Sequence, residues 1–193
     1  MDSLALRERA VLVRDGQPGL GPVIYWMHRE HRARDNHGLL LAQGLALSRG
    51  APLLVAHCLD PGYPGAVPGH FAFLLHGLEE TARDLAALGI PFLSLTGRPP
   101  REAARLARAL RAAALVTDFD PLRHKRTWLA ELAEWVDLPV WEADSRNVVP
   151  CRAASSKAEY MARTLRPKIH RLLPDFLVAP PPLAPHPHAF SWP

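Results

Sequence analysis

Short apolar segments alternate with longer amphipathic segments along this chain of 193 residues. The short segments are nearly apolar throughout, as strands covered on both faces are, and they span residues 23–27, 53–59, 91–95, 115–117 and 139–142. Helical patterns lie between the strands. One follows Asp35 and Asn36, either of which could cap it, and a second covers residues 71–88 and stops at Gly89. Three more cover residues 101–112, 127–136 and 157–172. This alternation predicts an α/β fold, a Rossmann-like open parallel sheet with helices on both faces.

The chain divides into three parts. Residues 1–20 are expected to form an N-terminal extension, and residues 21–173 the α/β domain. Residues 174–193 contain seven prolines, which cannot donate the backbone hydrogen bonds of helices or sheets, so they predict an extended, Pro-rich linker or tail.

Composition points to a cytoplasmic protein. The start of the chain lacks the apolar core of a secretory signal, and no apolar run approaches the roughly 20 residues needed to cross a bilayer. The two cysteines, Cys58 and Cys151, lie far apart and suit neither a disulfide framework nor a redox motif. Neither His28 with His31 nor His186 with His188 has an acidic or thiolate partner at diagnostic spacing, so no metal site is expected.

Ligands of open parallel sheets bind beyond the carboxyl ends of the strands, so the residues after each strand are the candidates for a site. Arg29 and two further arginines follow the first predicted strand and could hold an anion, or could instead pair with nearby carboxylates and fix the loop. Asp118 and Asp120 follow the fourth. Asp120 before Pro121 is best explained as a helix cap, whereas Asp118 could either contact a ligand or serve the fold.

A basic region lies near the end of the α/β domain. Between residues 145 and 173, seven basic residues face a single acidic one, Glu159. This surface could meet phosphates of DNA or an acidic partner, or it could be a solvated helix face. The candidate contacts for nucleic acid or a partner are Arg146, Arg152, Lys157, Arg163 and Arg166. Within the region, Ser156 and Glu159 have the spacing of a capping box.

Several segments, taken together, carry a family resemblance. YWMHREHR at residues 25–32 with Asp35 and Asn36, VTDFDPL at 116–122, and DSRNVVPC at 144–151 are followed in order by ASSKAEY at 154–160 and ARTLR at 162–166. The chain resembles the N-terminal α/β domain of class II cyclobutane-pyrimidine-dimer photolyases over roughly residues 20 to 177. It departs from the family pattern at His37, Arg146, Arg152 and Ser156, where the family usually has tryptophan, histidine, tryptophan and aspartate.

The resemblance implies an antenna-type domain associated with light-dependent repair of pyrimidine dimers in DNA. In such a domain a chromophore, a deazaflavin in some members, is bound near the strand ends. On topology, the positions expected to contact it are Met27, Arg29, Cys58, Asp118 and Phe119. The family's helical domain, which holds FAD and the flipped-out dimer, is expected to be absent here, so FAD is not expected on this chain alone.

Two functions follow as alternatives. In the first, the chain is a photolyase antenna-type domain without catalytic residues of its own, inactive in repair unless a separate chain supplies the FAD domain, and it meets DNA only weakly or through that partner. In the second, the photolyase-like fold serves as a stand-alone module that binds a nucleotide or another small ligand, because a fold does not fix a function.

Overall fold

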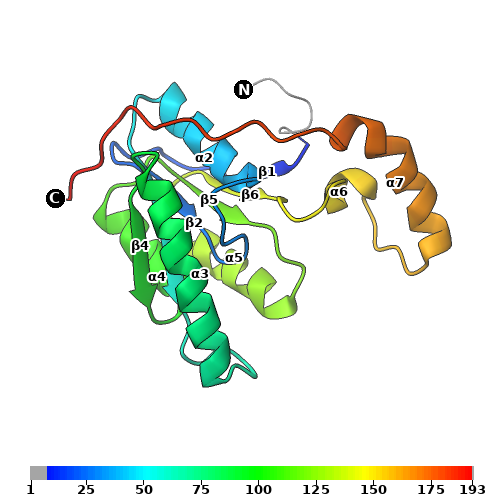
Figure 1. Ribbon diagram of the computed structural model, residues 1–193, viewed down its shortest axis with the longest axis horizontal. Coiled ribbons are helices and arrows are strands. Elements are labelled where there is room, and N and C mark those ends of the chain that lie inside the picture. The colour runs from blue at the N-terminus through cyan, green and yellow to red at the C-terminus, as the bar shows by residue number, and fades with distance from the viewer. Residues whose placement is uncertain (1–7, 193) are drawn as a thin grey trace.

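A central six-stranded sheet organises the computed structural model, which describes residues 8–192. The strand order is β1-β6-β5-β2-β3-β4, and all neighbouring pairs are parallel except β1 with β6 (Figure 1). The strands are β1 (Ala10–Arg14), β2 (Val23–Trp26), β3 (Leu53–Leu59), β4 (Phe92–Thr96), β5 (Ala114–Asp118) and β6 (Val140–Ala143). The predicted α/β class and the five predicted strands are confirmed, with bounds that shift by one or two residues.

Strand β1 was not predicted. It lies in the segment expected to be an N-terminal extension, and it pairs antiparallel with β6 at the edge of the sheet. Its side chains are only partly buried, and no helix follows it before β2. Its apolar run, residues 10–13, is not followed by a crossover helix, so β1 lies outside the alternation by which the other strands are recognised in the sequence.

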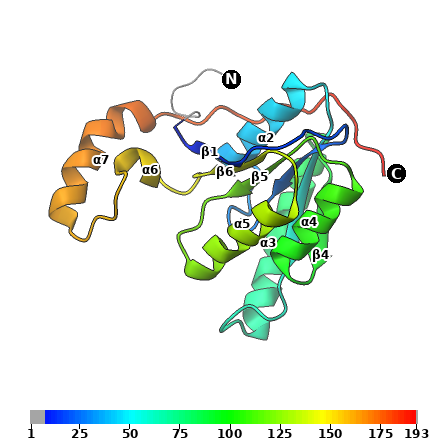
Figure 2. The ribbon, with the colours of Figure 1, turned by 180° about the vertical axis from the view of Figure 1, so that it is seen from behind.

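Helices cover both faces of the sheet, as predicted (Figure 2). On one face, Val23 and Tyr25 of β2 pack with α2 (His37–Ser48) and with the end of α3 (Pro68–Ala86). On the other, Ile24 and Trp26 pack with α4 (Pro99–Ala109) and α5 (Arg123–Trp135). Successive residues of a strand point to opposite faces, so β2 contributes to both cores. Over residues 8–192, no helix is both long and apolar enough to span a membrane.

Two predicted helix caps and one predicted helix stop can be compared with the observed helix ends. The Asn36 side chain accepts a hydrogen bond from the Leu39 N–H at 2.9 Å and caps α2, as predicted. Gly89, at φ 71°, turns the chain away after α3, also as predicted. The predicted cap at Asp120 is wrong, because α5 begins at Arg123 after Leu122. Asp120 instead accepts the Leu122 N–H at 3.0 Å and binds an arginine of the β2–α2 loop.

Two further helices, α6 (Cys151–Ala154) and α7 (Ala162–Phe176), form a small unit with its own apolar cluster and project to one side of the sheet (Figure 1). The helix predicted over 157–172 corresponds to α7, which begins and ends several residues later. The predicted capping box is wrong, because Ser156 and Glu159 lie outside the helix. Glu159 instead accepts hydrogen bonds from Ser155, Thr164 and Lys168, at 2.9, 2.6 and 2.5 Å.

The Pro-rich tail was predicted to begin at Pro174, but α7 continues to Phe176. Residues 177–192 then form no helix or strand and run back across the domain (Figure 1). Two side chains hold it. Gln43 of α2 donates to the Ala184 carbonyl at 2.7 Å, and His186 Nε2 lies 3.0 Å from the Ala51 carbonyl oxygen. The tail is thus packed on the α/β domain along its own length.

Candidate functional site

The candidate site lies where the strand order reverses, with β5 on one side of β2 and β3 on the other. At such a point the loops that follow neighbouring strands diverge and leave a crevice. Here the loop between β2 and α2 is anchored by one carboxylate from the end of β5. Asp118 accepts the backbone N–H groups of His28, Arg29 and Glu30 at 3.0, 2.8 and 3.0 Å, and the Tyr25 hydroxyl donates to its other oxygen.

This network defines the role of Asp118. The residue is 1% exposed, and both of its oxygens are occupied by groups of the protein. Burial, followed by the Asp118 charge, raises the pKa of Tyr25 well above its usual value, so Tyr25 stays a hydrogen-bond donor. Asp118 therefore acts as a structural clamp that fixes the loop on which Arg29 lies.

Two arginines of the same loop, Arg29 and Arg32, are paired within the protein. Arg29 lies 2.5 Å from Asp120 and 3.9 Å from Glu30, and Arg32 pairs with Glu30 and donates to the Asp35 carbonyl at 2.7 Å. Of the two alternatives that the sequence left open, the geometry matches the one in which carboxylates fix the loop. Arg29 brings little unpaired positive charge to an incoming anion.

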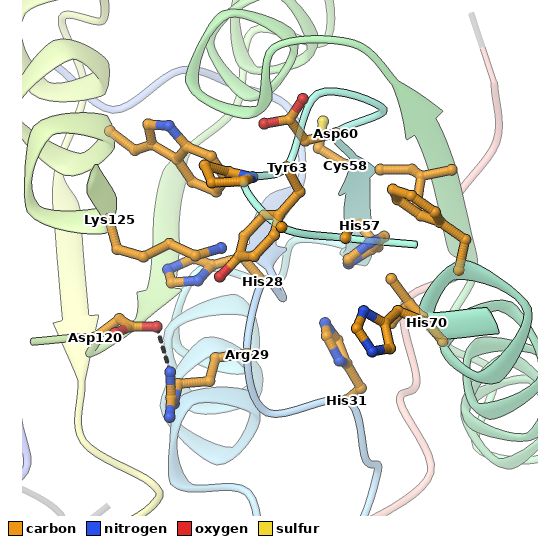
Figure 3. Close-up of a pocket in the computed structure, with 17 residues that line it drawn as sticks. His28, Arg29, His31, His57, Cys58, Asp60, Tyr63, His70, Asp120 and Lys125 are labelled. Atoms are coloured by element: carbon orange, nitrogen blue, oxygen red, sulfur yellow. Dashed lines mark hydrogen bonds and ion pairs between the residues drawn. The ribbon is translucent and has the colours of Figure 1, made fainter. Parts of the chain in front are cut away.

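Next to Arg29, a cavity of about 430 Å³ opens between the ends of β2 and β3, the loop that follows β3, and the helices α3 and α5 (Figure 3). Its polar lining residues come from four separate segments of the chain. They are His28, Arg29, His31, His57, Asp60, Tyr63, His70, Asp120 and Lys125. A cavity of this size, with mixed aromatic and polar walls, has the character of a small-molecule site.

One wall of the cavity combines aromatic rings with a buried cation. The Lys125 ammonium lies 3.9 Å from the ring centre of Trp128 and 5.2 Å from that of Tyr63. Burial lowers the pKa of Lys125 to about 8, although Asp120 and Asp118 oppose that shift. The wall thus combines aromatic rings with a poorly hydrated positive charge that lies over them.

Three buried histidines of the cavity, His28, His31 and His57, are neutral at physiological pH. Burial lowers the pKa of His28 to about 4 and of His31 to about 3, and it lowers that of His57 as well. The neighbouring thiol is also uncharged, because burial raises the pKa of Cys58 to about 12. A thiol with so high a pKa is a poor nucleophile at neutral pH.

The structure places the predicted contact residues in different surroundings. Arg29 and Cys58 line the cavity, whereas Met27, Asp118 and Phe119 do not. Met27 is fully buried in the core. Phe119 lies beneath the guanidinium groups of Arg126 and Arg152, at 5.9 and 5.6 Å, outside the cavity. Chromophore contact by the five residues stays a prediction.

Several other residues that line the cavity were not predicted from the sequence. His57 is a single polar residue in the apolar run of β3, and this exception was a usable signal. Tyr63 lies in a loop, and Lys125 and Trp128 lie on α5. Nothing in their local sequence marks them, because only the packing of α5 beside the end of β2 brings them to the cavity.

The predicted basic surface lies on and around α6 and α7. Arg152 binds the buried Glu142 at 2.5 Å. The other four residues are exposed, and no ion pair involves them within the described part of the chain; they are Arg146, Lys157, Arg163 and Arg166. Their contact with nucleic acid or a partner stays a prediction.

Comparison with known proteins identifies the family. The sequence profile of the DNA photolyase family matches residues 23–187, which is most of the chain. The chain belongs to the DNA photolyase family. Over 86% of its length it superposes on a cryptochrome from Synechocystis sp. PCC6803 with a TM-score of 0.68 at 15% identity, covering 36% of that chain. This photolyase-family chain therefore has the α/β fold of the photolyase and cryptochrome N-terminal domain.

Curated members of the photolyase family share much of this sequence. The deoxyribodipyrimidine photo-lyase of Potorous tridactylus is 42% identical over 167 residues, which are 86% of this chain and 31% of that protein. The proteins of the same name from Arabidopsis thaliana and Oryza sativa subsp. japonica are 40% and 41% identical, over 86% and 92% of this chain and 34% and 36% of theirs. The chain thus spans about a third of the length of these relatives.

Proposed function

We propose that this chain is the antenna-type N-terminal domain of a class II cyclobutane-pyrimidine-dimer photolyase, and that its cavity holds a planar heteroaromatic chromophore of the deazaflavin type. The assignment to class II rests on the motifs around residues 25–36, 116–122 and 144–151. The chromophore assignment rests on one observation, a cavity of about 430 Å³ with an aromatic wall at the carboxyl ends of the strands.

The cavity residues fit such a ligand. Trp128 and Tyr63 give the cavity an aromatic wall, and the Lys125 ammonium, which lies over the Trp128 ring, favours an oxygen that carries negative charge. His57 and His31 each leave a buried ring nitrogen without a hydrogen-bond partner in the described structure. Once bound, the chromophore absorbs light and passes its excitation energy on. The protein's task is to hold the ring in one orientation and away from water.

Binding of a chromophore is tested by two tryptophans of the same helix. Trp128→Leu removes the ring that lines the cavity and holds the Lys125 ammonium in place. It should weaken binding of 5-deazariboflavin about tenfold, since an aromatic contact contributes roughly 0.5–1.5 kcal/mol beyond the area it buries and a cation–π contact roughly 0.5–2 kcal/mol. Trp135 lies at the exposed end of α5, so Trp135→Leu is the matched control and should leave the dissociation constant unchanged. Equilibrium dialysis measures both constants. Equal affinities in the two variants would contradict the assignment of the cavity.

Repair itself is proposed to need an FAD-carrying domain in addition to the α/β domain described here. Dimer-containing DNA should be repaired under blue light when this chain is mixed with such a domain, and at a higher rate when the chain carries its chromophore. The same mixture kept in the dark is the control. Repair by this chain on its own under blue light would overturn the proposal.

A further inference from the structure

On one side of the cavity, the structure shows which ring nitrogen of His57 donates a hydrogen bond and which can accept one. His57 is 4% exposed, and its Nδ1 lies 2.9 Å from the main-chain oxygen of Met27. A carbonyl oxygen can only accept, so Nδ1 carries the proton of the neutral ring. The other ring nitrogen, Nε2, therefore presents a lone pair. Within residues 8–192, this buried Nε2 atom has no hydrogen-bond partner.

A neighbouring ring keeps this arrangement in place. The rings of His31 and His57 meet edge to face, with centroids 4.8 Å apart, and His31 Nε2 is likewise buried without a partner in the described structure. Desolvation by burial lowers the pKa of both rings, so neither gains a second proton at neutral pH. A buried acceptor that receives no hydrogen bond costs the fold free energy, and a ligand that donates to it recovers that loss.

The two sides of the cavity offer opposite chemistry. His57 and His31 lie on one side, whereas Lys125 and Tyr63 lie on the other (Figure 3). The histidine side can accept a hydrogen bond from a neutral N–H group. The lysine side attracts an electron-rich oxygen. A ligand that has both features can bind in only one orientation.

We propose that His57 is a specificity-determining residue, whose Nε2 accepts a hydrogen bond from a ring N–H of the cavity ligand. The site then selects a heteroaromatic ring with a lactam or imide N–H over the same ring alkylated at that nitrogen. This inference rests on the proposed function, since it assumes that the cavity binds a planar heteroaromatic ligand. It adds which end of the ligand the protein recognises and by which atom.

The test compares two probes that differ by one methyl group, 5-deazariboflavin and its N3-methyl derivative. Quenching of tryptophan fluorescence gives a dissociation constant for each. The unaltered protein should bind the N–H probe at least tenfold more tightly. His57→Phe should lose this preference and bind both probes with the affinity that the unaltered protein has for the methylated one. His76→Phe, a change at an exposed ring, should keep the preference.

His57→Phe also removes the hydrogen bond to the Met27 carbonyl, and this loss could itself disturb the cavity. A second measurement therefore uses the unaltered protein alone. In protein labelled with 15N-histidine, His57 should show an unprotonated Nε2 whose resonance moves when 5-deazariboflavin is added and stays in place with the methylated probe. If the unaltered protein binds both probes equally, or if the preference survives in His57→Phe, the role of His57 is overturned while the proposed function stands. If neither probe binds the unaltered protein, both are overturned.

Discussion

Replacing Asp118 with alanine should lower the free energy of unfolding by about 4 kcal/mol. The carboxylate accepts three backbone N–H groups of the β2–α2 loop and the Tyr25 hydroxyl, and it is 1% exposed. Hydrogen bonds to a charged group contribute roughly 1.5–3 kcal/mol, and each buried donor left without a partner costs roughly 1–3 kcal/mol. Not all of these losses add, because the loop can relax and admit water.

Asp118→Asn is the matched control. The amide oxygen can still accept from the loop, and the amide N–H₂ can donate to the Tyr25 hydroxyl, so the loss should be about 1–2 kcal/mol. Urea denaturation of the three proteins, with equal m-values, measures both differences. A loss below about 1 kcal/mol in Asp118→Ala would show that the clamp does not hold the loop.

Acidification should destabilise the fold well above the pH at which carboxylates protonate. Burial lowers the pKa of His28 and His37 to about 4 and of His31 to about 3, whereas in the unfolded chain each ring gains its proton near 6.5. Between about pH 4 and pH 6.5 the unfolded state therefore binds more protons. The free energy of unfolding falls as the pH falls through this interval, by roughly 1.4 kcal/mol per pH unit for each fully shifted ring.

Between pH 7 and pH 5 the expected loss is about 4 kcal/mol, after a discount for the partial solvent exposure of these rings. His28→Phe keeps an aromatic ring beside Trp26 and Trp128 and removes one titrating group, so it should reduce the loss between pH 7 and pH 5 by about 1 kcal/mol. His76→Gln, at an exposed ring, should leave the pH dependence unchanged. Chemical denaturation at several pH values measures this dependence. A stability that is flat from pH 7 to pH 5 would show that these rings are as well solvated as in the unfolded chain.

The sequence predicted those parts of the molecule that depend on local pattern. The five parallel strands follow from buried apolar runs, and the Asn36 cap follows from a short-range hydrogen bond. The roles of Asp118 and Asp120 could not be predicted, because their partners lie about 90 residues away along the chain. The same limit applies to Lys125, whose place at the cavity depends on how α5 packs and not on its neighbours in the sequence.

The α6–α7 unit is expected to unfold locally without unfolding of the sheet. Its apolar cluster is separate from the two cores of the sheet. Arg9 links the two parts, since its guanidinium donates to carbonyl oxygens of Asp144, Asn147 and Val148 and lies 5.5 Å from the ring of Phe176. Units with few shared contacts exchange their amide protons with separate free energies of opening. We therefore expect the amides of α7 to report local unfolding that breaks the Arg9 contacts, and those of β2 and β5 to report unfolding of the whole domain.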